Sequence, residues 1–581
     1  MTLRYLLAAL AVSLTPAAAF AMIAESSIPW WKHAVIYEIY TRSFADSNGD
    51  GVGDLNGITQ RLDHVEKLGV SAIWLTPMFS SPQVDFGYDV SDYRSIDPQF
   101  GTMADLERLQ AEAKKRGVRL ILDMVFNHTS DKHKWFVESA SSRTNAKADW
   151  YVWSDGLPAN APGVTAYQKR FEHEGRVPPN NWTSWLGGSA WQWVPARKQF
   201  YYHAFDKEQP DLNWRNPAVQ QAMLDVLRFW LDRGVDGFRL DAISMLFEDK
   251  RLRDQPLTGG LNAFGDPNQS IVYTTNLPEV HDVTRKMRKL VDSYPGDRVL
   301  IGEVVVYSLP ELTVWYGTPN SEGLHLPMNF IVGFGTRDYS PALIRRFMEG
   351  TDSELGKYPP LLVFDNHDQP RSLDRYGDGK HDIEIAKGIA AILLGSRGAA
   401  LTYYGAELGM RTQAPTRKED VRDPMGLRGW PKDKGRDGQR TPMQWTPGPH
   451  AGFSTNPKSW LPIPENHATI NVETQSADPN SLLNWYRTLI HLRATVPALR
   501  DGDMVMIDRE NPDVLAWRRD AAGAKAVVAI NMTGRPATLA LGDAGGTRFR
   551  TLAVSKTGTP ITSAGGKVTL PAFTSWVAAV E

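Results

Sequence analysis

Gly237-Phe238-Arg239-Leu240-Asp241 is a short apolar run that ends on a carboxylate, and the same pattern recurs twice further along the chain. Glu303 follows the run at residues 299–302, and Asp368 follows the run at residues 361–367. In a parallel α/β barrel the carboxyl ends of all strands lie on one face, where catalytic groups collect. We therefore predict that the three acids share one pocket, which is the arrangement that cleavage of a glycosidic bond requires.

Alternating strand and helix patterns extend this interpretation to most of the chain. Strands are expected at residues 35–44, 72–77, 119–125, 237–241, 299–304, 324–330, 361–367 and 399–404. Helices are expected at residues 58–68, 103–116, 218–233, 280–293, 341–348, 383–395 and 481–495, where apolar residues recur every three or four positions. Eight such βα units predict the α/β class, as a (β/α)8 TIM barrel.

Two long connections and a change of pattern divide the chain into domains. Residues 128–213 separate the third strand from its helix and are too long for a structureless loop, so we predict a small inserted domain there. Residues 243–276 form a second long loop over the same face. Short alternating runs after residue 500 predict a C-terminal antiparallel β-sandwich at 501–581. The barrel then comprises residues 22–127 and 214–500.

The first 21 residues resemble a secretory signal peptide. Arg4 precedes an apolar stretch at residues 5–14, and Ala19-Phe20-Ala21 is a small-x-small cleavage site. We expect export to the periplasm or the medium, with an uncleaved anchor as the alternative. No other segment resembles a membrane span. The chain has no cysteine, which excludes disulfides, and its net charge of −2 offers no basic surface for nucleic acid.

Five ordered motifs support a resemblance to a known family. They are DMVFNH at 123–128, QPDLN at 209–213, GFRLD at 237–241, GEV at 302–304 and FDNHD at 364–368. Together they resemble the α-amylase superfamily, glycoside hydrolase family 13, over essentially everything after the leader. Within this family the chain resembles the exo-acting α-glucosidases and the oligo-1,6-glucosidases, and the second motif is similar to a marker of the oligo-1,6-glucosidase branch.

The resemblance implies that Asp241 is the nucleophile, Glu303 the general acid/base and Asp368 the stabiliser of the transition state. Arg239 lies two residues before Asp241, so both point to the same side of a strand. We expect its guanidinium to keep Asp241 ionised. Apolar neighbours of Glu303 are expected to raise its pKa, so that it keeps its proton. The alternative is that these acids are merely structural.

The resemblance also implies a set of substrate-binding residues around one glucose. His128 and His367 would donate to its hydroxyls, although both are also typical of buried structural histidines. Asp85 and Tyr88 match the segment that closes the non-reducing end in α-glucosidases. Arg440 matches an arginine that pairs with Asp85, and this clamp implies exo cleavage. The alternative is a solvent-facing ion pair.

Residues 46–54 are a candidate site for a hard cation. The oxygens of Asp46, Asn48, Asp50 and Asp54 and the carbonyl of Val52 alternate around a glycine turn, which suits calcium or magnesium. By resemblance the ion would be structural and remote from catalysis. A metal-free loop of Asx turns is the alternative. No organic cofactor is expected.

Ala242, directly after the nucleophile, bears on which bond is cleaved. In this branch alanine or threonine there goes with α-1,4 bonds and valine with α-1,6 bonds, so we expect activity on maltose and short malto-oligosaccharides. An oligo-1,6-glucosidase, a transglucosylase, a trehalose synthase and a non-catalytic binding or transporter-accessory barrel remain as alternatives. Trp182, Trp185, Trp191 and Trp193 are candidates for the cleft wall or for buried packing. Leu186 stands where the family often has phenylalanine. The oligomeric state is left open.

Overall fold

The computed structural model describes residues 28–317, 319–558 and 560–581, so the predicted signal peptide lies outside the described residues. Eight parallel strands close into a barrel in the order β1-β17-β16-β15-β14-β11-β5-β2. The barrel strands are β1 (Val35–Ile39), β2 (Ala72–Leu75), β5 (Arg119–Val125), β11 (Gly237–Asp241), β14 (Val299–Gly302), β15 (Leu326–Asn329), β16 (Leu361–Val363) and β17 (Ala399–Tyr403). The TIM-barrel prediction is confirmed.

Helices surround this barrel at the predicted places. They include α2 (Leu55–Gln60), α3 (Leu62–Leu68), α4 (Met103–Lys115), α7 (Pro217–Leu231), α8 (Glu279–Asp292), α11 (Pro341–Leu355), α13 (Asp382–Gly395) and α16 (Leu482–Thr495). The start of α7 follows from its sequence: the Asn216 side chain accepts from the backbone N–H of Ala218, and Pro217 occupies the first turn. The single helix predicted at 58–68 is divided at Arg61, and the helix predicted at 341–348 continues to Leu355.

Several strands are shorter than predicted. The first ends at Ile39 and is followed by a helical turn, α1 (Thr41–Phe44), and the seventh ends at Val363 rather than at residue 367. The residues beyond each end stay buried although they no longer pair, and the local pattern does not mark where pairing stops. The shortening of β16 matters for function, because it leaves residues 364–368 as a loop over the end of the barrel.

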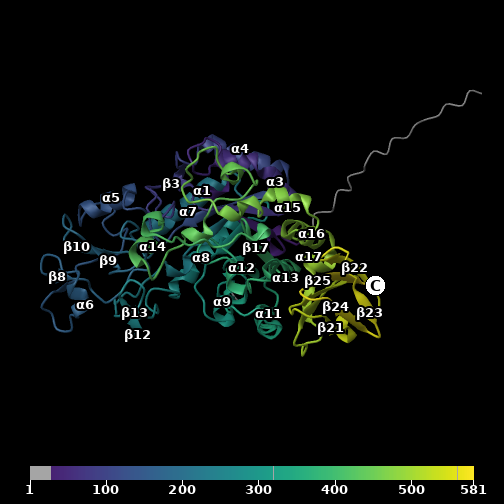
Figure 1. Cartoon of the computed structure of the whole chain (residues 1–581). Helices are drawn as coiled ribbons and strands as arrows, with labels where there is room; N and C mark the ends of the chain where they lie inside the picture. Colours follow the sequence, from purple (N-terminus) through teal and green to yellow (C-terminus); the bar gives the residue numbers. More distant parts are fainter. Residues whose placement is uncertain (1–27, 318, 559) are drawn as a thin grey trace, which may run out of the picture.

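The connection between β5 and α7 forms a separate small layer. It contains α5 (Lys134–Ser141), β6 (Trp153–Ser154), β7 (Leu157–Pro158), α6 (Ala166–Lys169), β8 (Arg176–Val177), β9 (Trp191–Val194) and β10 (Gln199–Tyr202). The strands pair antiparallel as β6-β10-β9 and β7-β8. The loop after β11 carries the hairpin β12 (Leu257–Leu261) and β13 (Pro267–Gln269). Figure 1 shows this hairpin beside the inserted layer, at one end of the molecule.

The C-terminal residues form two antiparallel sheets at the opposite end (Figure 1). The larger contains β18 (Asp503–Met506), β19 (Val514–Ala521), β20 (Ala524–Asn531), β25 (Ser575–Val580) and β22 (Phe549–Val554). The smaller contains β21 (Ala537–Ala540), β24 (Lys567–Leu570) and β23 (Thr562–Ala564). Side chains of both sheets, such as Val527 and Leu539, share one buried cluster, as in a sandwich. No described helix has the length and apolar character needed to cross a bilayer.

Candidate active site

One cavity of about 280 Å³ lies where the carboxyl ends of the barrel strands meet, and Asp241, Glu303 and Asp368 all line it. Asp241 ends β11, Glu303 follows β14, and Asp368 lies in the loop after β16. The other predicted residues in the wall are Asp85, Tyr88, His128, Ala242 and His367. The volume is near the lower end of the range for small-molecule sites, which suits a ligand about the size of a sugar ring.

The guanidinium of Arg239 contacts both Asp241 and Glu303. Its Nη1 donates to Asp241 Oδ1 at 2.6 Å, and its Nη2 lies 2.7 Å from Glu303 Oε2. Arg239 is also held by Asp123 on β5, whose two oxygens lie 3.0 and 3.2 Å from Nη1. The sheet register explains this contact, because Arg239 is paired with Asp123 in adjacent strands. Arg239 is fully buried, so its charge acts on both acids without solvent screening.

Burial raises the pKa of both Asp241 and Glu303, each to about 7. In each case the Arg239 charge lowers the pKa but does not outweigh the loss of solvation, and the two carboxyls repel each other. Arg239 thus favours the ionised form of Asp241, as expected, while burial acts more strongly in the opposite direction and raises the pKa of this carboxyl. The two groups titrate as a coupled pair, and near neutral pH this pair holds about one proton.

Asp368 has the opposite electrostatics. Burial opposes its ionisation, but the guanidinium groups of Arg436 and Arg440 hold the pKa of this carboxyl below its usual range. Arg440 Nη2 lies 2.9 Å from Asp368 Oδ1, and Arg436 Nη1 lies 3.2 Å from the same oxygen. Asp368 is therefore an anion at neutral pH, next to a pair that retains a proton.

The prediction that Arg440 pairs with Asp85 is wrong. Asp85 Oδ1 receives its hydrogen bond from Arg436 Nη2 at 2.7 Å, whereas Arg440 binds Asp368 and the carbonyl of His367. Arg436 and Arg440 flank the short helix η5 (Asp437–Gln439); Arg436 lines the cavity, whereas Arg440 is fully buried beside it. The ion pair of Asp85 is therefore made with Arg436 instead. Asp423 also binds Arg436, with its Oδ2 at 2.9 Å from Nε.

The two histidines are held by neighbours as well as facing the cavity. His367 Nε2 lies 2.7 Å from the Tyr88 hydroxyl, and its Nδ1 lies 2.6 Å from Glu38 Oε1. Tyr88 also stacks on the His367 ring, with centroids 5.4 Å apart. His128 Nε2 lies 3.1 Å from the Tyr88 carbonyl, and burial lowers the pKa of His128 to about 3. Burial also lowers the pKa of His367, so both rings stay neutral and combine structural contacts with a place in the pocket wall.

Ala242 adopts an unusual backbone conformation beside the acids. Its φ is 42° and its ψ is 33°, in the left-handed region that residues with a Cβ rarely adopt. In this conformation its N–H donates to Glu303 Oε2 at 3.0 Å. Strained backbone of this kind is concentrated at functional sites. Here it supplies a hydrogen bond that orients the Glu303 carboxyl.

The catalytic-domain model of the alpha-amylase family matches residues 38–502, which covers the barrel and the inserted layer. The chain belongs to the alpha-amylase family. Its relatives show that the chain is a glycoside hydrolase. It is 42% identical to the "Probable alpha-glucosidase" of Rhizobium meliloti, over 88% of this chain and 91% of the relative. It is 37% identical to the oligo-1,6-glucosidase of Parageobacillus thermoglucosidasius, over 88% and 92% of the two chains.

Comparison with solved structures supports the same family assignment. The alpha-glucosyl transfer enzyme XgtA is 40% identical, with a TM-score of 0.84, over 95% of this chain and all of that chain. A trehalulose synthase, MutB, is 33% identical, with a TM-score of 0.83 over 95% and 100% of the two chains. The relatives thus include proteins named as glucosidases, as a glucosyl transfer enzyme and as a trehalulose synthase, so membership alone does not decide between these reactions.

Four contributors to the site of this α-amylase-family chain were absent from the sequence prediction: Arg436, Asp123, Glu38 and Gln209. Gln209 Nε2 lies 3.1 Å from His128 Nε2 and 3.4 Å from Asp85 Oδ2. Asp123 and Gln209 both lie inside the motifs quoted above, so those motifs could have identified them as site residues. Arg436 and Arg440 are four residues apart in one loop, and only the packed structure distinguishes their partners.

Of the four candidate tryptophans, Trp185 lines the cavity and Leu186 follows it in the wall. Trp185 keeps 41% of its surface exposed. Trp182, Trp191 and Trp193 are buried in a cluster within the inserted layer, where Trp182 and Trp191 stack with centroids 5.9 Å apart. These three tryptophans support the layer that carries Trp185, rather than the ligand.

The candidate cation loop of the α-amylase-family chain is closed by its own hydrogen bonds. Asp46 accepts from the N–H groups of Asn48, Gly49 and Gly51 and from the Ser454 hydroxyl. The Asn48 and Asp50 side chains accept from the N–H groups two residues on. Asp54 caps α2. The donor chemistry suits a hard cation, yet these are also Asx turns. Within residues 28–317, 319–558 and 560–581, no three His, Cys, Asp or Glu side chains are grouped to hold a metal.

Proposed function

We propose that this protein is an exo-acting, retaining α-glucosidase that releases glucose from maltose and short malto-oligosaccharides. The observation that supports the proposal most is the set of residues that line one small cavity: the carboxyl pair Asp241 and Glu303, the separate carboxylate Asp368, and the Asp85–Arg436 ion pair. Asp85 and Arg436 form an ion pair in the wall of this cavity, and we propose that this pair blocks a longer chain on that side. A glucosyl unit at the non-reducing end then fits, whereas an internal segment of starch does not.

In the proposed reaction Asp241 attacks the anomeric carbon while Glu303 gives its proton to the leaving oxygen. The coupled pair supplies both forms, because near neutral pH it carries one proton over two carboxyls. Arg239 contacts both groups, so it compensates charge as the proton leaves Glu303 and negative charge leaves Asp241. Glu303 then acts as base toward water, which releases glucose with retained configuration.

Asp368 is proposed to stabilise the positive charge that develops on the sugar ring. Its low pKa keeps it anionic throughout the cycle, and two arginines hold it in place. Neutral His128 and His367 can share hydrogen bonds with the same ring without adding charge. An ionised group that is already oriented costs no reorganisation as the transition state forms.

The test is to incubate the purified protein with maltose, isomaltose, sucrose and trehalose and to follow anomeric signals by NMR. We expect α-glucose as the first product, from maltose fastest. Hydrolysis of isomaltose tenfold faster than of maltose would contradict the linkage assignment. An Ala242→Val variant is expected to shift the ratio toward isomaltose by a modest factor, since a methyl-scale change in a pocket contributes about 1–3 kcal/mol.

Glucosyl transfer is the second candidate function. The solved enzyme XgtA, 40% identical, is described as an alpha-glucosyl transfer enzyme. Both reactions use the same glucosyl-enzyme intermediate, and the outcome depends on whether water or a sugar hydroxyl reaches it first. The discriminating measurement is the ratio of transfer products to free glucose at rising maltose concentration.

We also propose that residues 46–54 bind a structural calcium or magnesium ion, because their alternating oxygens match the ligand preference of hard cations. Elemental analysis after dialysis should find about one equivalent of metal, and a chelator should lower Tm. If no metal is detected and the chelator leaves Tm unchanged, the metal proposal is wrong and the loop is a metal-free set of Asx turns.

Export is proposed from the leader at residues 1–21. Fractionation of cells that express the full chain is expected to recover activity outside the cytoplasm, with the mature N-terminus after Ala21. Recovery of the uncleaved chain in the cytoplasm would contradict it.

A further inference from the structure

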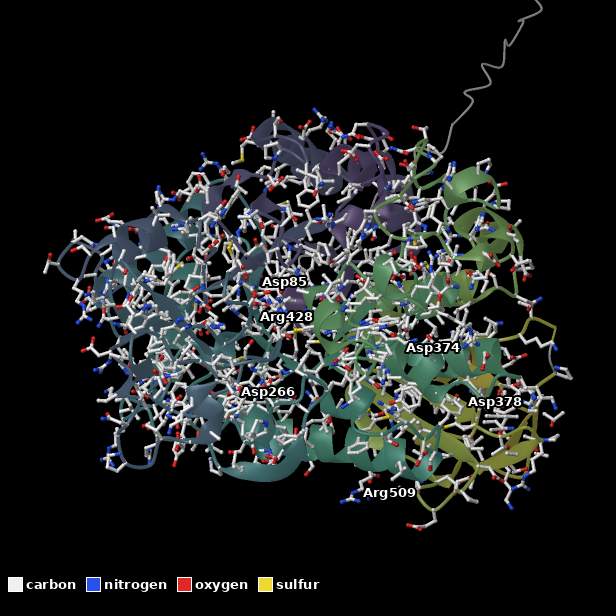
Figure 2. The ribbon with its side chains drawn as sticks, turned by 60° about the vertical axis from the view of Figure 1, so that its left-hand side comes forward. Asp85, Asp266, Asp374, Asp378, Arg428 and Arg509 are labelled. Atoms are coloured by element: carbon white, nitrogen blue, oxygen red, sulfur yellow. The ribbon has the colours of Figure 1, made fainter. Side chains whose placement is uncertain are left out.

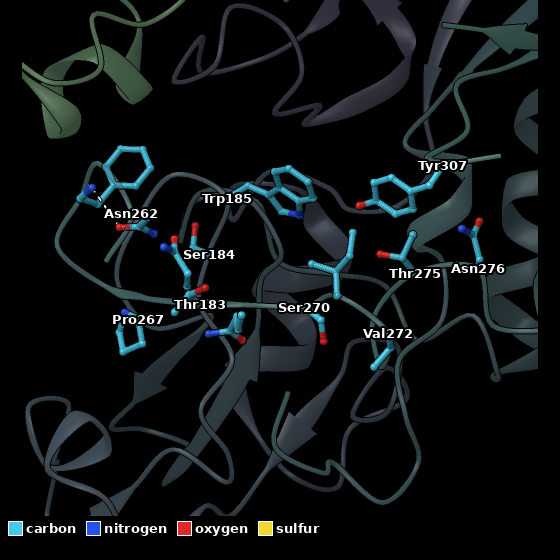
Figure 3. Close-up of a pocket in the computed structure, with 14 residues that line it drawn as sticks. Thr183, Ser184, Trp185, Asn262, Pro267, Ser270, Val272, Thr275, Asn276 and Tyr307 are labelled. Atoms are coloured by element: carbon cyan, nitrogen blue, oxygen red, sulfur yellow. Dashed lines mark hydrogen bonds between the residues drawn. The ribbon is translucent and has the colours of Figure 1, made fainter. Parts of the chain in front are cut away.

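Two large hollows besides the active-site cavity differ in charge and in place. One is an open groove of about 680 Å³ whose fourteen lining residues, all in the described part of the chain, are uncharged. Figure 3 shows Trp185 and Tyr307 in this groove, and Trp185 also lines the active-site cavity, so the groove belongs to that site. The other hollow, of about 560 Å³, is charged and lies at the opposite, amino-terminal ends of the barrel strands.

This second hollow, the basic groove, is formed by helix α4 and by the turns that lead into three adjacent strands, β5, β11 and β14. Each turn contains a lining glycine in the left-handed region: Gly117, Gly234 and Gly296 have φ of 72°, 82° and 91°. A Cβ at Gly117 would meet no heavy atom within 4 Å, so the groove is open there. The other lining residues are Glu107, Gln110, Ala111, Lys114, Val118, Arg119, Arg233, Asp236 and Arg298.

The basic groove carries an excess of positive charge. Four of its lining residues are basic and two are acidic, Glu107 and Asp236. Asp236 already has partners, because its Oδ1 lies 2.6 Å from Arg298 Nη1 and its Oδ2 accepts from the N–H of Leu120 at 3.0 Å. The whole chain has a net charge of −2, so this excess is local. Charge of one sign in a cleft raises the local concentration of ions of the opposite sign.

Arg119 and Lys114 have no anionic partner. In the described part of the chain neither makes an ion pair or a hydrogen bond through its side chain, and the Arg119 guanidinium lies over the Trp30 ring, 4.6 Å from its centroid. Nε of Arg298 is also buried without a partner. Arg119 is half-buried, and a half-buried cation without an acceptor loses solvation that no protein contact replaces.

Two guanidinium groups of the groove are close enough to repel each other. Burial lowers the pKa of Arg119, and the charge of Arg298 lowers it further, whereas Asp236 and Asp297 act in the opposite direction. Because Asp236 is already bound to Arg298, it compensates this repulsion only in part. A bound anion would reduce the repulsion and supply the acceptor that Arg119 lacks.

Stabilisation of helix C-termini explains only part of this charge. Arg233 Nη1 donates to the carbonyl of Phe229 in α7, and Arg298 Nη1 donates to the carbonyl of Gly234, both at 3.2 Å. Cations commonly bind the free carbonyls at helix ends in this way. Arg119 begins a strand and makes no such contact, and the Lys114 ammonium in the last turn of α4 makes none within the described residues. These two side chains remain free to bind a ligand.

We infer that the basic groove binds a phosphate group, either the free ion or the phosphate of a small ester. A guanidinium matches two phosphate oxygens at once, and a lysine adds a point charge. The volume lies within the range of small-molecule sites and exceeds the size of one phosphate group, so it accommodates both sources. The inference goes beyond the proposed function, because the groove lies at the other end of the strands that carry Asp241 and Glu303.

The test is calorimetric titration of the purified protein with sodium phosphate and, separately, with glycerol 3-phosphate, which has no sugar ring to enter the active-site cavity. Sodium chloride keeps the ionic strength constant. We expect saturable binding of about one equivalent, and a Tm that rises with phosphate concentration because the ligand binds only the folded chain.

Arg119→Gln is expected to weaken phosphate binding roughly ten- to hundredfold, the effect of losing a charge-assisted hydrogen bond. Lys114→Gln should weaken it about threefold, as an exposed charge contributes less, and this exposed position does not endanger folding. Lys115→Gln is the matched control. Lys115 is the next residue of α4 and has the same charge, but it pairs with Glu112 and lies outside the groove lining, so binding should stay within about twofold of the parent.

The two ligands distinguish the sources of the phosphate group. Tighter binding of the free ion assigns the groove to inorganic phosphate, and tighter binding of glycerol 3-phosphate assigns it to an ester. The inference is overturned if the parent binds neither ligand saturably at millimolar concentrations. Equal weakening in Lys115→Gln and Arg119→Gln, or an equal rise of Tm with chloride alone, would also overturn it, because either result reports net charge rather than a site.

Discussion

Arg239 donates to Asp123 and Asp241 through one nitrogen and reaches Glu303 through the other. At the residue scale this fork decides how protons are distributed in the site. The guanidinium lowers the pKa of both reacting acids, yet burial has the larger effect and leaves each near 7. A carboxyl that holds its proton at neutral pH can serve as a general acid.

The pH profile of kcat/KM should therefore fall on its alkaline side near pH 7. A raised pKa means that Glu303 is protonated below about 7 and loses, above that value, the proton that the proposed mechanism requires it to donate. On the acidic side activity should also fall, because a second proton on the coupled pair removes the nucleophile. A profile that stays flat from pH 6 to pH 9 would contradict this assignment.

Asp241→Asn is expected to lower kcat by roughly four orders of magnitude or more, as the loss of a nucleophile does elsewhere, and to raise Tm. The sign follows from the raised pKa. The unfolded chain ionises Asp241 near pH 4 but the folded chain only near 7, so this group makes the protein less stable as pH rises from 4 to 7.

The amide is neutral at every pH, so the gain in Tm should be larger at pH 8 than at pH 5. Melting curves of both proteins at the two pH values measure it. A lower Tm for the variant at pH 8 would mean that the contact with Arg239 outweighs burial.

At the scale of elements, a short helix after the barrel holds the inserted layer over the site. Arg428 on α14 (Pro424–Gly429) binds both oxygens of Asp206, at 2.5 and 2.6 Å. Asp206 is buried, and its backbone N–H donates to Gln209, which contacts Asp85 and His128. Figure 2 shows Arg428 and Asp85 in the middle of the molecule.

Arg428→Ala should raise KM for maltose severalfold with a smaller change in kcat. It leaves a buried carboxylate without its cation, and the resulting shift passes through Gln209 to the closed end of the pocket. Because the Arg428 side chain is partly exposed, we expect a cost in stability of only about 1 kcal/mol. Arg417→Ala is the control, since Arg417 pairs with Asp420 on the surface nearby. Equal KM values for the two variants would contradict the coupling.

At the scale of the whole molecule, the C-terminal sheets are packed onto the barrel through polar as well as apolar groups. Trp517 on β19 is fully buried, and its indole N–H donates to the carbonyl of Gly395 at the end of α13. Arg519 donates to the same carbonyl at 2.9 Å. Arg345 on α11 donates back to the carbonyl of Val514. Each of the two domains thus donates hydrogen bonds to backbone carbonyls of the other.

Trp517→Ala should lower the free energy of unfolding by about 3–5 kcal/mol while kcat stays near that of the parent. The change empties a large buried volume and leaves one hydrogen bond unmade, but it lies outside the active-site cavity. Chemical denaturation and steady-state kinetics measure the two effects. Val505→Ala, at a partly exposed position on β18, is the control and should change stability by less than about 0.5 kcal/mol. A large loss of kcat in Trp517→Ala would show that the sandwich affects catalysis.

The barrel could be predicted from sequence because its signal is local. Apolar strand runs alternate with helical periods, and three acids follow such runs at residues 241, 303 and 368. Parallel βα units have few ways to close, so order along the chain sets position around the barrel. Where the chain left the sheet, after Ile39 and Val363, it stayed buried, and the boundaries were misjudged.

By itself, then, the sequence determined the α/β barrel, the family and the set of acids that meet in one cavity. Only the tertiary structure decided that Arg436 rather than Arg440 holds Asp85, that Asp241 shares its proton affinity with Glu303, and that Trp185 and Tyr307 border an uncharged groove. These depend on how deeply each side chain is buried and on distances between segments far apart in the chain. Desolvation and Coulomb energies follow from those quantities, which no local pattern encodes.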